Sequence, residues 1–357
     1  MFNLKVTPRE ICQYIEEFNK RIDTHYERTR FYMAHIIRSH HENSARQKIA
    51  KKLKRNQAMI TVDWKMKWLA TAFRESQGEW FAKAGMIWQG IMVVVKVING
   101  AGEIEFHTYT FHHVSDDKVE DAFASLSSLS QAIAQAKGKF PWIDEAFLFS
   151  DGAGCYGGAF TAINLSQIGE WTGVLISIHF VSESGQGKSV LDCILGLQSQ
   201  FLNRVGNYGD GCDIYDAASL AKAPNYRGGI KGTINNELVY DRPTQQCCKK
   251  GSLKGLQKMR QREYKYDSSR KFKALVLYQN SFSNNKGQTI SAAKLKKMMK
   301  SGSFQKKPDT LLIENQQTIV KDALKWPPNK RKTEAQKKRE NQKKKAEKKK
   351  TDHKKNG

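Results

Sequence analysis

The segment from residue 171 to 204, WTGVLISIHFVSESGQGKSVLDCILGLQSQFLNR, constrains the fold more strongly than any other part of the chain. The apolar run from Val174 to Val181 predicts a buried strand. A turn of small residues follows, and apolar side chains then recur at helical spacing, at Val190, Ile194, Leu197 and Phe201. Asp192 falls in the first turn of that helix, where the helix dipole favours a carboxylate. The segment is therefore predicted to be a strand–turn–helix unit with an acid just beyond a core strand.

Two other acids occupy comparable positions upstream. Asp63 lies in the apolar run AMITVDW, and Asp151 directly follows the run AFLFS. Any one of these acids alone is explained as a cap or turn residue. Three acids at strand ends and at a helix start together predict one cluster of carboxylates.

The order of the expected elements indicates the fold class. Strands are expected at 58–64, 87–98 and 103–111, then a helix at 116–136, a strand at 147–149, a helix at 154–168, and the strand and helix of the segment 171–204. This order is that of a ribonuclease H-like fold, an α/β fold with a mixed five-stranded sheet flanked by helices. The first three strands form an antiparallel meander, and the other two join in parallel through right-handed crossovers. The first and fourth strands are then neighbours, so Asp63 and Asp151 are expected to meet.

A carboxylate cluster of this kind suits metal-dependent phosphodiester chemistry. Mg²⁺ prefers oxygen ligands from a few carboxylates and from the substrate phosphate. Two divalent ions can serve the attacking and the leaving oxygen of a strand-cleavage reaction. We expect Mg²⁺ or Mn²⁺, with Asp63 bridging two ions, Asp151 holding one, and a third acid holding the other.

Three sequence blocks also carry a resemblance to a known family. They are VDWKMKWLATAFRESQGEWFAKAG, FLFSDGAGCYGG and HFVSESGQGKSVLD, within a resemblance that covers roughly residues 51–223. In this order they resemble the catalytic core of eukaryotic DDE/D transposases and of transposon-derived proteins. The resemblance implies cut-and-paste DNA strand cleavage and strand transfer in the nucleus, by a homo-oligomer assembled on DNA.

The resemblance also assigns catalytic residues. Asp63 and Asp151 match the first two catalytic acids of the family. The third is Asp192 or Glu183, and Asp192 is preferred because a helix fixes its side chain. Position 152 is Gly where relatives often carry Asn, which weakens a hydrogen-bonding role there. Alternatives are a domesticated, inactive transposase that binds DNA or chromatin, and a structure-specific nuclease on the same fold.

The charge of the chain points to a polyanionic partner, in the first place DNA. The formal net charge is +25, and residues 329–357 supply 14 Lys and Arg residues against 4 acids. Lys188 is expected to touch a phosphate backbone, and the basic stretch 249–265 offers further phosphate contacts. The residues assigned to DNA there are Lys249, Lys250, Lys254, Arg260 and Arg262. The clusters KRK and KKKAEKKK resemble a nuclear import signal.

The composition along the chain predicts four regions. They are a helical N-terminal arm with two helical runs (1–56), the catalytic core (57–224), a basic C-terminal region that is a candidate small subdomain (225–328), and a disordered Lys-rich tail (329–357). A further helix is expected at about 214–223, hairpin character at 226–241, a strand at 271–278 and a short basic helix at 292–299. No apolar run reaches the length of a transmembrane helix, and the N-terminus does not resemble a signal peptide. The six cysteines show no CxxC spacing and are expected to be reduced thiols. His179 either faces the carboxylates or fills the core, and the core is the preferred interpretation.

Overall fold

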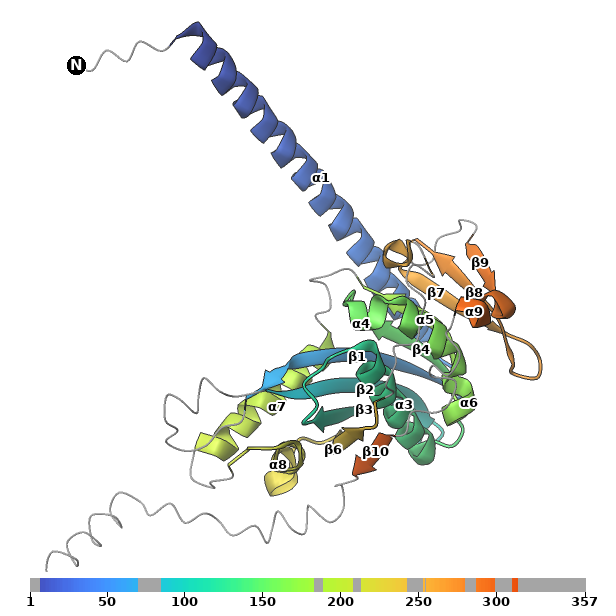
Figure 1. Ribbon diagram of the computed structural model, residues 1–357. Helices are drawn as coiled ribbons and strands as arrows, with labels where there is room; N and C mark the ends of the chain where they lie inside the picture. The colour runs from blue at the N-terminus through green and yellow to red at the C-terminus, as the bar shows by residue number, and fades with distance from the viewer. Residues whose placement is uncertain are drawn as a thin grey trace, which may run out of the picture.

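The computed structural model describes residues 7–69, 85–182, 189–207, 213–242, 253, 255–279, 287–298 and 310–313 (Figure 1). The predicted tail at 329–357 lies outside these ranges. In chain order, the helices and strands are α1 (Pro8–Lys52), β1 (Gln57–Trp68), β2 (Met86–Ile98), β3 (Ile104–Ser115), α3 (Ala122–Lys139), β4 (Glu145–Ser150), α4 (Gly154–Gly157), α5 (Ala159–Asn164), α6 (Ile168–Thr172), β5 (Leu175–Val181), α7 (Val190–Asn207), α8 (Ala217–Lys222), β6 (Thr233–Tyr240), β7 (Gln261–Tyr266), β8 (Phe272–Tyr278), β9 (Gln288–Ser291), α9 (Ala292–Met298) and β10 (Thr310–Ile313).

The described strands form one sheet of ten strands, in the order β10-β6-β3-β2-β1-β4-β5-β7-β8-β9. At its centre, β1, β2 and β3 form an antiparallel meander, and β4 and β5 continue from β1 in parallel. The predicted α/β fold with a mixed sheet flanked by helices is thus confirmed. The predicted number of five strands is wrong, because C-terminal strands extend the sheet beyond β3 on one side and beyond β5 on the other. β6 and β7 carry few apolar residues, so their periodicity is weak, whereas the strand expected at 271–278 is observed as β8.

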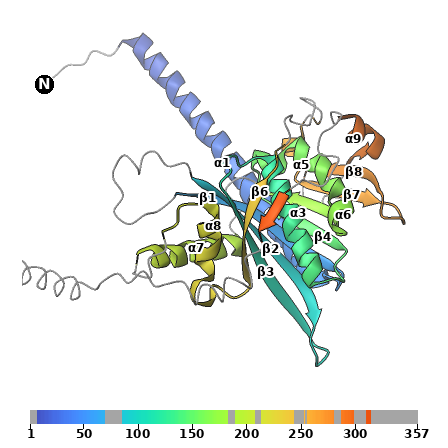
Figure 2. The ribbon, with the colours of Figure 1, turned by 60° about the horizontal axis from the view of Figure 1, so that its bottom comes forward.

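Helices cover both faces of the sheet, and Figure 2 shows α3 and α6 on one side with α7 and α8 on the other. Side chains alternate between the faces along each strand. Ile60 and Val62 of β1 therefore pack in the large core beneath α3. Met59 packs on the opposite face, against Ile49 and Leu53 at the end of α1. On that same face, α7 and α8 cover Trp88 and Met92 of β2; their buried side chains there include Leu191, Leu195, Leu202 and Leu220.

The N-terminal helix is longer and simpler than the sequence predicts. Two separate helical runs were expected before residue 53, but α1 is one continuous helix of 45 residues. Pro8 is its first residue, in agreement with the preference of proline for that position. Ala45, Ile49 and Leu53 anchor its last turns in the core, and the rest projects away from the body (Figure 1).

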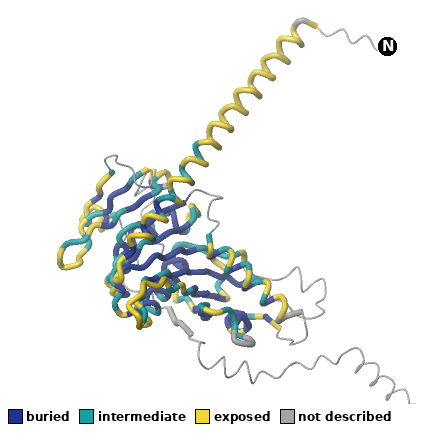
Figure 3. The backbone as a smooth tube through the Cα atoms, turned by 180° about the vertical axis from the view of Figure 1, so that it is seen from behind, coloured by how far each residue is buried: buried dark blue, intermediate teal, exposed yellow. Residues whose placement is uncertain are grey.

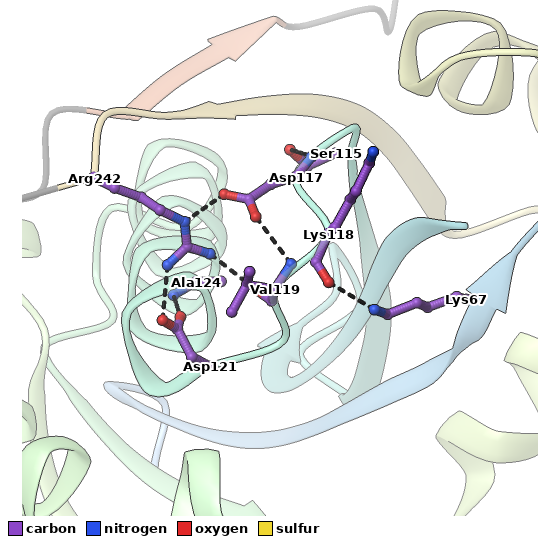
Figure 4. A network of polar contacts seen from close by, with 8 residues as sticks. All are labelled: Lys67, Ser115, Asp117, Lys118, Val119, Asp121, Ala124 and Arg242. Atoms are coloured by element: carbon purple, nitrogen blue, oxygen red, sulfur yellow. Dashed lines mark hydrogen bonds and ion pairs between the residues drawn. The ribbon is translucent and has the colours of Figure 1, made fainter. Parts of the chain in front are cut away.

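The helix α3, which follows β3, begins later in the chain than predicted. The helix was expected from residue 116, whereas α3 begins at Ala122, with Asp121 as the N-cap that accepts from the backbone of Ala124 at 2.9 Å. Arg242, which follows β6, contacts the segment before α3 (Figure 4). The guanidinium donates to Asp117 at 2.5 Å, to Asp121 at 2.7 Å and to the carbonyl of Val119 at 2.9 Å. Arg242 therefore joins the β3–α3 connection to the end of β6.

Three other element predictions need correction. The helix expected at 154–168 is broken into α4, α5 and a single turn of 3-10 helix. The hairpin expected within 226–241 is instead the single strand β6, which pairs in parallel with β3 and antiparallel with β10. The helix expected at 214–223 is the shorter α8. Each of these segments is short, and tertiary pairing decides its structure.

Candidate carboxylate site

The register between β1 and β4 brings two of the predicted acids level with each other. The two strands are parallel, and Val62 is paired with Ser150 at the end of β4. The next residue on each strand is an acid, Asp63 on β1 and Asp151 after β4. The parallel register of the two strands therefore aligns Asp63, within β1, with Asp151, just after β4.

The third acid arrives from α7, which lies on the same face as Asp63. Asp63 is paired across the sheet with Gly90 of β2, and the absence of a side chain at Gly90 lets α7 come close. A Cβ atom at Gly90 would stand 3.0 Å from Leu191 and 3.1 Å from Leu195. Asp192 lies directly after Leu191, and its carboxyl group shares a hydrogen bond with Asp63. Close packing of the helix on a glycine thus completes the trio.

The cluster shifts the pKa values of Asp63 and Asp151. Burial raises the pKa of Asp63 to about 7, and the charges of Asp151 and Asp192 add to the effect. Burial also raises the pKa of Asp151, with Asp192 contributing, although a hydrogen bond from the backbone of Ala153 opposes the shift. All three side chains remain partly exposed, so they are accessible from outside.

Backbone groups hold two of the acids in place. Asp151 accepts from the backbone of Ala153 at 2.9 Å. Asp192 accepts from the backbone of Ser189 at 2.6 Å, so it caps its own helix. Within the described ranges, no group of three or more His, Cys, Asp and Glu side chains stands at metal-ligand spacing. Charge interactions act over longer distances than metal–ligand bonds, so neighbouring acids raise the pKa values of Asp63 and Asp151 without standing at ligand spacing.

The last turns of α1 also reach the carboxylates, which the sequence did not indicate. Arg46 lies close enough to Asp192 for their charges to interact, and it pairs with Glu42 at 3.7 Å. Glu42 in turn accepts a hydrogen bond from the hydroxyl of Ser182, just after β5. Arg46 also stacks on the ring of Phe149, 4.7 Å from its centre. A cation from the N-terminal helix therefore balances part of the negative charge of the site.

A buried polar pair lies beneath the acids. The hydroxyl of Tyr156 accepts from the side-chain amide of Gln89 at 2.9 Å, and both residues are buried. Burial holds the pKa of Tyr156 well above its usual value, and Asp63 and Asp151 contribute to that shift. Tyr156 is therefore a neutral phenol that supports the site from inside the core.

A hollow of about 330 Å³ adjoins Asp151. Its lining is made by four glycines together with Val181, Arg260 and Arg262. Arg260 is partly exposed and donates to the carbonyl of Ser182 at 3.2 Å. The side chain of Arg262 is fully buried and donates to the carbonyls of Tyr156 at 3.3 Å and Gly157 at 2.7 Å. The predicted DNA contact of Arg262 is therefore replaced by a structural role, whereas Arg260 remains at the surface of the site.

Several predicted residues fall outside the described ranges. They are Glu183, Lys188, Lys249, Lys250 and Lys254, together with three of the six cysteines. The three described cysteines are free thiols, as expected. His179 fills the core: its ring is fully buried and hydrogen-bonds to Ser150 at 2.8 Å. Burial and the charge of Arg262 hold the pKa of His179 well below its usual value, so the ring is neutral.

One sequence signal for the missed part of the site was present. Gly90 interrupts the β-branched run of β2, and a glycine inside a strand often marks a close approach of another element. Glu42, Arg46 and Gln89 gave no such signal, because their approach to the acids depends on how α1 and β2 pack.

Comparisons with known proteins add a family but no activity. No curated protein matches the chain. Among the described helices, none is both long and apolar enough to cross a bilayer. One family model matches residues 42–220, which include all three acids, Arg46 and Gly90. The chain therefore belongs to the family described as Domain of unknown function (DUF8701).

Proposed function

We propose that this protein cleaves and joins DNA strands in a metal-dependent reaction of the DDE/D transposase type. The observation that carries the proposal is the convergence of Asp63, Asp151 and Asp192 from three separate segments onto one face of the sheet. A carboxyl group whose pKa is raised by burial and by neighbouring carboxylates in a partly open site, as for Asp63, is typical of functional rather than structural positions. The same three residues are the ones that the resemblance to transposases assigns to catalysis.

The architecture supports a ribonuclease H-like core for this activity. The central order β3-β2-β1-β4-β5, antiparallel over three strands and then parallel over two, is the order expected for that fold. Asp63 lies within β1, level with Asp151 just past the end of the parallel strand β4, and ligands bind beyond the carboxyl ends of strands in open α/β sheets. The strands beyond β3 and β5 are then additions at the two edges.

Mg²⁺ or Mn²⁺ fits the donor set. The described side chains at the centre of the site offer carboxylate oxygens, which these hard cations prefer. Asp63, Asp151 and Asp192 would hold the ions, with Glu183 as the other candidate for the third ligand. Bound divalent ions would stabilise the charge on the attacking and leaving oxygens of a phosphodiester. The chain itself contributes the fixed positions of the acids, through the β1–β4 register and the Ser189 cap.

DNA is the substrate that the charges favour. Arg260 lines the hollow that also includes Gly152, next to Asp151, and the chain carries a net charge of +25. The lysines at 188, 249, 250 and 254 extend the same basic character on either side of the site in sequence. We further propose that the protein acts in the nucleus as a homo-oligomer on DNA.

The direct test is nicking of supercoiled plasmid by the purified full chain in Mg²⁺ or Mn²⁺. We expect Asp63→Asn, Asp151→Asn and Asp192→Asn each to abolish nicking, and Glu183→Gln to leave it intact. Asp213→Asn is a matched control, because Asp213 is an exposed aspartate in the segment before α8. Loss of activity in Glu183→Gln but not in Asp192→Asn would move the third ligand to Glu183.

Two other outcomes separate the alternatives. Cleavage without joining of strands would favour a structure-specific nuclease on the same fold. Salt-sensitive DNA binding with neither cleavage nor stabilisation by Mg²⁺ would favour a domesticated DNA-binding protein and would refute the catalytic proposal.

A further inference from the structure

The outer part of α1 exposes apolar side chains that a lone helix in water does not favour. Phe18 is 54% exposed, Tyr26 67% and Ile37 57%. At 1.5 Å per residue the 45 residues of α1 extend about 68 Å, and only the last turns are buried. The burial-coloured view shows the projecting part exposed along its whole length (Figure 3).

The exposed residues lie on one side of the helix. With 3.6 residues per turn, ten of them share a single stripe. They are Ile11, Tyr14, Ile15, Phe18, Ile22, Tyr26, Tyr32, Met33, Ile36 and Ile37. Along the centre of the stripe, apolar residues at 11, 15, 18, 22, 32 and 36 follow the alternating steps of four and three of a coiled-coil seam, with His25 and Thr29 at the two positions between 22 and 32. The stripe is therefore built to pack against another helix.

The stripe is large enough to hold a partner. A fully covered aromatic side chain buries about 150–250 Å². The stripe has four aromatic and six other apolar side chains, each at least 48% exposed, so two stripes that cover each other bury an area on the order of that of a stable interface, about 1,200–2,000 Å². Monomers seldom expose contiguous apolar patches of this extent.

We propose that the partner is a second copy of this chain, with the two α1 helices packed antiparallel. The charges along α1 are distributed asymmetrically. Residues 8–27 carry five acids and three Lys or Arg residues, whereas residues 28–52 carry seven Lys or Arg residues and one acid. Antiparallel packing places the acidic half of each helix against the basic half of the other. Parallel packing would place the two basic halves together, next to two strongly basic bodies.

This proposal does not depend on the chemistry of the carboxylates. It names the surface through which a homo-oligomer would form, whatever reaction the site performs.

The first measurement is the molar mass of the full chain in solution, by light scattering after size exclusion. We expect a mass near twice the 40.7 kDa of one chain. Phe18→Gln with Ile22→Gln, both in the stripe, is expected to weaken the dimer at least roughly tenfold. Phe31→Gln is the matched control, because Phe31 is 69% exposed but lies on the opposite side of α1. Its dimer should have the affinity of the wild type.

Charge exchange tests the orientation. Glu16→Lys with Glu17→Lys should weaken an antiparallel dimer, and adding Arg28→Glu with Arg30→Glu in the same chain should restore it. Circular dichroism must show that each variant keeps its helix. A monomeric wild type at micromolar concentration, or a double Gln variant that dimerises as well as Phe31→Gln, would overturn the proposal. Stronger association of the Glu16→Lys, Glu17→Lys variant would overturn the antiparallel arrangement.

Discussion

Replacing Asp63 by asparagine tests the electrostatics of the carboxylate site without any assumption about activity. Asparagine has nearly the same shape and can still hydrogen-bond to Asp192, but it carries no charge. The pKa of Asp63 is raised from 3.8 to about 7 in the folded protein. The folded protein therefore disfavours the ionised form of Asp63 that the unfolded chain adopts, and this difference lowers the stability of the wild type.

The size of this effect follows from the pKa shift. About 1.4 kcal/mol per pKa unit gives roughly 4 kcal/mol as an upper value. Asp63 is partly exposed, and solvent screening reduces the expected gain to about 1–3 kcal/mol. The sign is fixed by the direction of the shift. The penalty is absent near and below pH 3.8, grows as the pH rises toward 7, and is complete above pH 7.

Urea unfolding of the metal-free protein at pH 5 and pH 8 measures the difference. Asp63→Asn should be more stable than the wild type by about 1–3 kcal/mol at pH 8 and by less at pH 5. Asp213→Asn should show no such pH-dependent gain. A difference that does not change with pH, or an Asp63→Asn variant less stable than the wild type at pH 8, would refute the reasoning. If the metal proposal also holds, Mg²⁺ should stabilise the wild type and not Asp63→Asn.

Three further variants test how the fold supports the site. Gly90→Ala should lower stability by about 1–3 kcal/mol and reduce plasmid nicking, because its Cβ would push α7 outward. Gly196→Ala in α7 has open space around it and should be neutral or stabilising. Equal effects of the two variants in urea unfolding would contradict this. Arg242→Ala should cost about 1–3 kcal/mol, and a double-mutant cycle with Asp121→Ala should show less than additive loss; full additivity would mean that their 2.7 Å contact contributes little. Burial lowers the pKa of His113 to about 4 in the folded protein. As the pH falls below 6.5, the unfolded chain takes up a proton that the folded protein does not, and stability falls by up to about 1.4 kcal/mol per pH unit. His113→Gln should reduce this loss in urea unfolding between pH 7 and pH 5.

The central sheet could be predicted because its strands are strongly apolar. Residues 58–64, 87–98 and 103–111 all lie within observed strands except Glu103 at one margin, since β-branched runs of this length have few other stable conformations. Among the outer strands, β8 could be predicted from its apolar run, whereas a strand such as β6, with sequence TINNELVY, becomes a strand through pairing with β3.

The sequence by itself determined which acids were candidates, because the positions of Asp63, Asp151 and Asp192 at the ends of apolar runs are visible in the chain. Only the tertiary structure decided that they meet. The parallel register of β1 and β4 aligns two of them, and the close packing of α7 on Gly90 adds the third. The structure alone also placed Arg46 beside Asp192 and buried Arg262 among backbone carbonyls. The physical reason is that strands and helices form from local patterns, whereas the neighbours of a charge depend on packing between segments far apart in the chain.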